Sequence, residues 1–225
     1  MSKENLKRPS KNLIESFSKL ATPTISDALD RLEIKGGCEG VLPIIQGSKI
    51  VGPAFTLKYI PVGVKKGTVG DYIDLAQPGD VFVLDNRGRT DCTVWGGILS
   101  VTAKLKGIAG TIIDGVCRDV EEVYEQKYPI FSRGRFMVTG KDRVQLEAMN
   151  IPVCIANVQV KPMDIVVADD SGVLIIPQEK AEEVLELSQN ITEKENKIEK
   201  AVKGGLSLLE ARKKYGYHTL QRKNK

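Results

Sequence analysis

The residues best suited to chemistry lie in one stretch, residues 95–120. Within it, Gly96-Gly97 precedes a segment, 98–106, whose apolar side chains recur with helical spacing. A glycine turn before a helix leaves backbone N–H groups unpaired, and such groups bind anions. Arg118-Asp119 follows the apolar run 111–113, which is typical of a buried strand. If both ends of this unit face one pocket, one end binds a carboxylate and the other supplies a cation and a metal ligand.

Each of these features also has a plainer interpretation. A Gly-Gly pair commonly forms only a turn, and an exposed Arg–Asp pair contributes about 0–1 kcal/mol of stability. Cys117 is either a thiol whose pKa is lowered by the adjacent Arg118 or a small buried residue. The four cysteines form no C-x-x-C pair, which argues against a zinc knuckle or a thioredoxin-type site. The one histidine, His218, lies near the C-terminus, so a Ser-His-Asp or Cys-His arrangement is not expected.

Composition places the chain among ordinary globular proteins. Of its 225 residues, 41% are hydrophobic and 28% charged. The net charge of +4 comes largely from the two ends, so direct binding of nucleic acid is not expected. No apolar run approaches the roughly 20 residues of a membrane span, and the N-terminus has no signal-peptide core. These features predict a cytoplasmic protein with reduced cysteines and no membrane partner.

Helical and strand patterns alternate along the chain and predict an α/β or α+β fold with a mixed sheet. Thr22 is expected as a helix N-cap, with Pro23 at the first helical position. Gly52-Pro53 is expected to break a strand, and 86–94 to form a polar loop after a strand that ends at Asp85. The basic ends, 1–11 and 215–225, are expected to be disordered. Helices are expected over 12–20, 22–32, 98–106, 120–126, 179–203 and 206–214, and strands over 50–51, 54–60, 81–84, 111–113, 158–160, 164–169 and 173–176.

Six short motifs in this order resemble one known family. The family joins the class II pyruvate aldolases for 4-hydroxy-4-methyl-2-oxoglutarate (HMG) and 4-carboxy-4-hydroxy-2-oxoadipate (CHA) to the RraA-like regulators of ribonuclease E activity, and was formerly mislabelled as demethylmenaquinone methyltransferase. The resemblance covers about residues 12–205, which predicts one RraA-like domain there and a helical, basic extension over 206–225. The motifs are Thr22-Pro23 with Ser26-Asp27-Ala28-Leu29-Asp30, Gly52-Pro53-Ala54, Pro78-Gly79-Asp80-Val81, Gly96-Gly97-x-Leu99, Asp114-Gly115-x-x-Arg118-Asp119 and Ala168-Asp169-Asp170-x-Gly172-Val173-x-x-x-Pro177.

The resemblance implies a swivelling β/β/α fold with a long C-terminal helix, assembled as homotrimers or hexamers with the active site between subunits. It also implies a divalent metal, Mg²⁺ or Mn²⁺, with Asp119 as its ligand. Arg118 would then pair with the oxygens of a pyruvate moiety and stabilise its enolate. The turn at Gly96 and the backbone N–H groups of Gly97, Ile98 and Leu99 would hold the pyruvate carboxylate. The implied reactions are cleavage of a 4-hydroxy-2-oxo acid to pyruvate and, through the same enolate, decarboxylation of oxaloacetate.

The sequence departs from the family pattern at one position that concerns chemistry. The aldolases carry an acidic residue, then twenty residues, then Arg-Asp, and the corresponding position here is Gly97. The acid missing at Gly97 could be replaced by Asp85, Asp91 or Asp114. Two functional classes therefore stay open: a metal-dependent lyase that acts on a 2-oxo acid, and a non-catalytic regulator that docks on an enzyme such as a ribonuclease. The retained Arg118-Asp119 pair favours the lyase.

Overall fold

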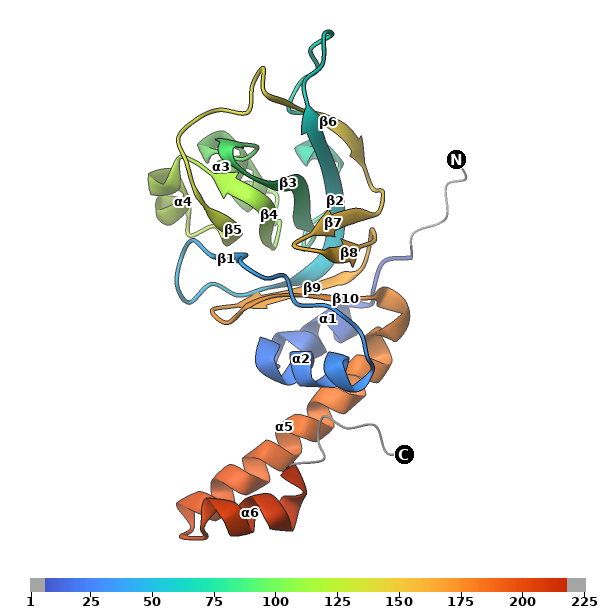
Figure 1. Ribbon diagram of the computed structural model, residues 1–225, viewed down its shortest axis with the longest axis vertical. Coiled ribbons are helices and arrows are strands. Elements are labelled where there is room, and N and C mark those ends of the chain that lie inside the picture. The colour runs from blue at the N-terminus through green and yellow to red at the C-terminus, as the bar shows by residue number, and fades with distance from the viewer. Residues whose placement is uncertain (1–6, 218–225) are drawn as a thin grey trace.

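A mixed β-sheet forms the centre of the molecule in the computed structural model, which describes residues 7–217 (Figure 1). Within these residues, eight strands pair in the order β1-β5-β4-β3-β2-β9-β10, with β6 also paired to β2. Strands β2 to β5 are parallel to one another, whereas β1, β6, β9 and β10 run antiparallel to their neighbours. The strands are β1 Leu42–Pro43, β2 Ile50–Pro61, β3 Val81–Thr93, β4 Gly110–Cys117, β5 Ile130–Arg135, β6 Val144–Met149, β9 Ile165–Asp169 and β10 Gly172–Ile176.

The parallel part of the sheet is buried on both faces. Every residue of β4 is buried, and alternate residues of β3 face opposite sides, as the pleat of a strand requires. Phe82 and Leu84 pack beneath α3 (Gly97–Leu105) and α4 (Val120–Gln126). Val81 and Val83 pack against a separate two-stranded hairpin, β7 (Val153–Ile155) and β8 (Val158–Val160). The carboxyl ends of β3 and β4 therefore emerge beside the α3–α4 layer.

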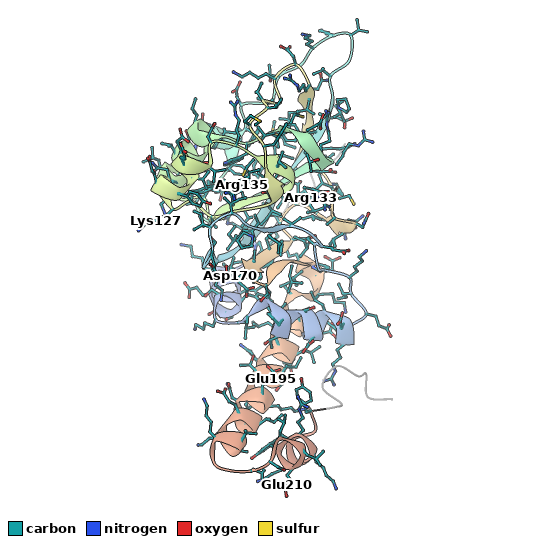
Figure 2. All side chains as sticks on the ribbon, turned by 60° about the vertical axis from the view of Figure 1, so that its left-hand side comes forward. Lys127, Arg133, Arg135, Asp170, Glu195 and Glu210 are labelled. Carbon is teal, nitrogen blue, oxygen red and sulfur yellow. The ribbon has the colours of Figure 1, made fainter. Side chains whose placement is uncertain are left out.

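Three further helices cover the β9–β10 part of the sheet, and one of them extends well beyond it. Helices α1 (Lys11–Ser18), α2 (Thr22–Arg31) and the first half of α5 (Ala181–Lys203) share an apolar cluster with β9 and β10. The second half of α5 projects away from the sheet and carries α6 (Leu208–Tyr215) at its far end (Figure 1). Glu195 and Glu210 mark this helical arm, and Arg133 and Arg135 mark the distant strand β5 (Figure 2). Short 3₁₀ helices occupy Ile73–Leu75 and Gln178–Lys180.

The predicted α/β fold with a mixed sheet, flanking helices and a long C-terminal helix is confirmed, but several boundaries differ. Strand β2 continues through Gly52-Pro53, because at this point it changes partner from β9 to β3. A Cβ atom on Gly52 would lie 2.2 Å from the carbonyl oxygen of Gly79, so the close approach of these two backbone segments requires glycine. Strand β3 runs on to Thr93, with register breaks after Asp85, where a loop was predicted. Strand β6 was not anticipated.

Two other expectations change at the ends of the chain. Thr22 is the first residue of α2 instead of its N-cap, which is Ala21. Of the ends predicted to be disordered, residues 1–6 and 218–225 lie outside the described residues. For the remainder the prediction is wrong: Arg8 is bound to Asp80, and Lys11 and Tyr215 belong to α1 and α6. Among the helices of residues 7–217, none is long and apolar enough to cross a membrane.

Asp169 joins α2 to the β9–β10 turn. Its carboxylate accepts hydrogen bonds from the backbone N–H (2.8 Å) and the hydroxyl (2.6 Å) of Thr22 and from the backbone N–H of Ser171 (2.9 Å). Burial alone would raise the pKa of Asp169, but the hydrogen bonds from Thr22 and Ser171 outweigh it and lower the pKa. The ionised carboxylate therefore stabilises the fold.

Replacing Asp169 by Asn should lower the free energy of unfolding by about 2 kcal/mol at pH 7, since hydrogen bonds to a charged acceptor are lost. Because the pKa is lowered in the folded state, this contribution is present above the unfolded value of about 4 and is lost as the pH falls below it. Urea unfolding of both proteins between pH 3 and pH 7 measures it. A wild-type advantage that stayed constant down to pH 3 would contradict this explanation.

Candidate active site

A pocket of about 170 Å³ lies at the carboxyl ends of β3 and β4. Its walls come from three segments that are distant in the sequence: the first turn of α3, residues 118–119 after β4, and residues 139–141 between β5 and β6. The site residues predicted from the sequence all line it, namely Gly96, Gly97, Ile98, Leu99, Arg118 and Asp119. Both ends of the 95–120 unit therefore face one pocket, as predicted from the glycine turn and the Arg-Asp pair.

Asp119 connects the two ends of this unit. Its Oδ2 accepts a hydrogen bond from the backbone N–H of Gly97 (2.9 Å) and lies 3.5 Å from Nε of Arg118. The N-terminal turn of α3 thus binds a carboxylate, here that of a neighbouring side chain. A Cβ atom on Gly96 would lie 2.6 Å from the same Oδ2, so a side chain at this position would displace the carboxylate.

The backbone of Asp119 is itself unusual. Its φ of 55° and ψ of 47° lie in the left-handed region, at the N-cap of α4. This conformation costs a non-glycine residue about 1–2 kcal/mol, and such residues cluster at functional sites. The turn directs the carboxylate back towards α3 instead of along the helix axis. Asp119 is one of nine non-glycine residues with positive φ in the described part of the chain, and the one of them that lines this pocket. The resemblance identifies this same residue as the metal ligand.

Thr93, at the end of β3, connects all three walls of the pocket. Its buried hydroxyl oxygen lies 2.9 Å from the carbonyl oxygen of Trp95 and 2.8 Å from that of Val116, and accepts a hydrogen bond from the N–H of Trp95 (3.1 Å). A hydroxyl group has one proton, so it donates to one of the two carbonyl groups at a time. The backbone N–H of Thr93 donates to the carbonyl oxygen of Val138 (3.0 Å) in the third segment. No sequence pattern indicated this junction.

Hydrogen bonds of Trp95 and Ser100 hold the glycine turn in place. The indole N–H of Trp95 donates to the hydroxyl oxygen of Ser100 (2.9 Å), which lies 3.1 Å from the carbonyl oxygen of Gly96. The carbonyl oxygen of Trp95 also accepts from the backbone N–H of Arg118 (3.2 Å). The turn and the arginine therefore keep their relative positions through buried hydrogen bonds.

None of the three acids considered as replacements at Gly97 lines this pocket. Asp85 and Asp114 face a separate cavity of about 590 Å³ on the hairpin side of the sheet. Asp85 accepts from the N–H groups of Arg87 and Cys154, and Asp114 accepts from Arg133 and the N–H of Ala156. These buried carboxylates hold the β7–β8 hairpin.

The remaining acid, Asp91, is bound to Arg89 at the surface. The hydrogen bond from the guanidinium group of Arg89 lowers the pKa of Asp91 to about 2. Its charge is therefore engaged outside the pocket.

A different carboxylate lies beside Gly97. A Cβ atom built on Gly97 would be 3.2 Å from Cγ of Glu122 and 3.3 Å from Cβ of Asp119. A side chain at position 97 would thus enter the space that the Glu122 side chain now reaches from α4. Glu122 is three residues after Asp119 in the first turn of α4, where negative charge is favourable. In the sequence, only the i, i+3 spacing of Asp119 and Glu122 indicates that the two acids lie on one side of the helix.

The pocket suits a hard divalent cation with few protein ligands. Among residues 7–217, no group of three or more His, Cys, Asp or Glu side chains could enclose a metal ion. Asp119 nevertheless offers a carboxylate to an open pocket, and the stem of the Glu122 side chain lies beside Gly97. Mg²⁺ binds through one or two carboxylates while keeping several waters. The residues therefore fit Mg²⁺ or Mn²⁺ better than a caged metal. Cys117 does not line this pocket; it is a small buried residue, and burial raises its pKa to about 11 instead of Arg118 lowering it.

The fold and this pocket together define an α/β protein with an anion site, a guanidinium group and a carboxylate at the carboxyl edge of a sheet. The sequence model of a family described as "RraA-like: Aldolase/RraA" matches residues 22–175. The chain belongs to this RraA-like family.

Individual relatives agree with this assignment. Protein DlpA of Legionella pneumophila is 41% identical over 92% of this chain, and the chain spans about a third (34%) of the length of that protein. A protein of Halalkalibacterium halodurans named "Putative 4-hydroxy-4-methyl-2-oxoglutarate aldolase" is 31% identical over 89% of this chain and 93% of its own. The crystal structure of an uncharacterized protein from Pseudomonas syringae pv. tomato is similar with a TM-score of 0.86 and 40% identity, covering 92% of this chain and 99% of that chain.

Replacing Thr93 by Val should reduce the free energy of unfolding by about 2 kcal/mol, because Val removes the hydroxyl group that accepts from the N–H of Trp95 and donates to the carbonyl oxygen of Trp95 or Val116. For a chain of this size that corresponds to about 4–8 °C in Tm. Unfolding followed by the fluorescence of Trp95, the one tryptophan of the sequence, reports on the pocket directly.

Two matched variants test the explanation. Thr93→Ser keeps the hydroxyl group and should recover most of the loss. Thr102→Val removes a threonine hydroxyl that bonds only to its own helix, at the carbonyl oxygen of Ile98, and should change stability by less than about 0.5 kcal/mol. An equal loss in Thr93→Val and Thr102→Val would show that the junction has no special weight.

Proposed function

We propose that the protein is a metal-dependent class II pyruvate aldolase, which cleaves a 4-hydroxy-2-oxo acid of the HMG or CHA type. The observation that carries this proposal is the meeting of the Gly97 N–H, the Arg118 guanidinium group and the Asp119 carboxylate in one pocket. The family membership and the relative named as an HMG aldolase support it.

The proposed reaction breaks the bond between C3 and C4 of the substrate. The C4 hydroxyl group loses its proton and becomes a carbonyl group, while the electron pair of the broken bond forms the enolate of pyruvate. Protonation at C3 then gives free pyruvate. The new negative charge lies on the enolate oxygen, which is where a preorganised cation lowers the barrier most.

Each residue of the pocket has a part in this scheme. The N–H groups of Gly97, Ile98 and Leu99 would hold the carboxylate of the pyruvate moiety, since the first N–H groups of a helix have no partner within it. The substrate would replace Asp119 as the acceptor of the Gly97 N–H. Arg118 donates to the enolate oxygen. Asp119 would hold the Mg²⁺ or Mn²⁺ ion, which when bound would supply a Lewis acid to stabilise the developing enolate.

Glu122 takes the role that an acid at position 97 would have. We assign it this role because its Cγ would lie 3.2 Å from a Cβ atom at position 97; from there its carboxylate would accept the C4 hydroxyl proton, directly or through a water molecule. Decarboxylation of oxaloacetate passes through the same enolate, but releases CO₂ and has no hydroxyl proton to remove. That side activity should therefore depend on Arg118 and Asp119 and not on Glu122.

We also propose that the chain works as a homotrimer or hexamer. Next to the pocket, Ile98 is 86% exposed and Met137 is 74% exposed, and large apolar side chains at that level of exposure favour coverage by another subunit. A second copy seated there would close the pocket from water and strengthen its electrostatics.

Purified protein should release pyruvate from HMG or CHA and from oxaloacetate in a lactate dehydrogenase-coupled assay, and EDTA should abolish the release. Arg118→Ala and Asp119→Ala should each lower kcat by at least about 100-fold, because each removes charge stabilisation of the enolate. Arg89→Ala is the matched control, since Arg89 belongs to an Arg–Asp pair outside the pocket, and should change kcat less than twofold. Absence of release from all three compounds would sink the aldolase proposal and favour a regulator that binds a protein partner.

Moving the acid between positions tests the role of Glu122. Glu122→Ala should lower the rate of HMG cleavage by about 100-fold or more and leave oxaloacetate decarboxylation within about threefold. The double variant Gly97→Asp/Glu122→Ala should regain cleavage, because the new side chain enters the space that the glutamate vacates. A parallel loss of both activities in Glu122→Ala would assign the residue to metal binding or structure instead of proton transfer.

A further inference from the structure

The pocket contains a second cationic side chain that the proposed mechanism does not use. Of the residues that line it, Arg118 and Lys141 are cationic and Asp119 is anionic. Arg118 and the α3 turn lie on one side, and Lys141 comes from the third wall, between β5 and β6. The enolate chemistry explains Arg118 and leaves Lys141 without a role.

The backbone that carries Lys141 is held in place by the end of β3. Thr93 donates its N–H to the carbonyl oxygen of Val138 and pairs as an isolated bridge with Thr139. A Cβ atom on Gly140 would lie 2.4 Å from the carbonyl oxygen of Thr93, so the two backbone segments are in direct contact. The N–H of Lys141 donates to the hydroxyl oxygen of Thr139 (3.2 Å). Lys141 is thus fixed relative to Arg118 through the junction that also holds the glycine turn.

The charge of Lys141 is not used by a neighbouring carboxylate. In the described part of the chain, the ion pairs of nearby residues join Lys66 to Asp142 (2.9 Å) and Lys58 to Glu147 (2.9 Å), and Lys141 forms none. Lys141 is exposed, so its ammonium group is available to a ligand in the pocket that it lines. The matching ligand group is an anion other than the one held by Gly97 and Arg118.

We propose that Lys141 binds a second carboxylate, at the far end of the substrate, and so selects dicarboxylic over monocarboxylic 2-oxo acids. This inference rests on the proposed function, because it places the 2-oxo acid end of the substrate at Gly97 and Arg118. In a 4-hydroxy-2-oxo acid the group on C4 leaves as part of the second product. Lys141 acts as a specificity residue: it aligns C4 by holding its carboxylate and takes no part in bond cleavage.

Equilibrium binding separates this role from catalysis. 2-Oxoglutarate and 2-oxopentanoate share the 2-oxo acid end and a five-carbon chain, and neither has a C4 hydroxyl group, so neither undergoes the aldol cleavage. Calorimetric titrations with Mg²⁺ present should show about tenfold tighter binding of 2-oxoglutarate to the wild type. Lys141→Met should bind the two ligands equally, with unchanged affinity for 2-oxopentanoate, whereas Lys141→Arg should keep the preference. Lys66→Met, a lysine paired outside the pocket, should behave as wild type.

The outcomes separate this inference from the proposed function. If the wild type binds both ligands equally, or if Lys141→Met keeps the preference, Lys141 does not read a second carboxylate, while pyruvate release from HMG would still uphold the aldolase. If Lys141→Met weakens the binding of both ligands alike, the residue is structural and the inference fails. If the wild type binds neither ligand, the pocket is not a 2-oxo acid site, and both the inference and the proposed function fall.

Discussion

The pocket depends on the hydrogen bonds that one buried residue, Thr93, forms with its walls. Through its oxygen and its backbone N–H, this residue contacts the turn before α3, the end of β4 and the segment before β6. Each of these segments carries a different chemical group, respectively a set of N–H donors, an arginine with a carboxylate, and a lysine. A pocket that gathers groups from remote parts of a chain needs such a common point, because a misplacement of about 1 Å costs much of the catalytic effect.

The pocket also includes irregular backbone geometry. Strand β3 loses its regular register after Asp85, before its last residues reach the site. Asp119 adopts a left-handed conformation, and a Cβ atom at Gly96 would contact its carboxylate. The rest of the molecule, with its fully buried β4 and its three apolar clusters, supplies the stability that tolerates this strain.

The sequence predicted the parts of this arrangement that are encoded locally. The glycine turn, the helix after it, the buried strand and the Arg-Asp pair all lie within residues 95–120, and their spacing brought them to one pocket as expected. The path of β3 could not be foreseen, because residues 86–93 are polar and their strand form depends on pairing with β4. The proximity of Glu122 to Gly97 was also missed, because it arises from the packing of α4 against α3. The acids predicted as replacements lie near the site in the sequence, but none of them lines the pocket: Asp85, Asp91 and Asp114.

The helical arm has a consequence for how the molecule opens. The first half of α5 buries Val184, Ser188 and Ile191 against the body, whereas Ile198 is the one buried residue of its second half. Segments with little buried apolar surface open with a lower free energy than the global unfolding reaction. The amide hydrogens of the outer half of α5 and of α6 should therefore exchange with solvent as a separate cooperative unit. The arm can unfold and refold locally, or bind another molecule, while the pocket at the opposite end of the body keeps its geometry.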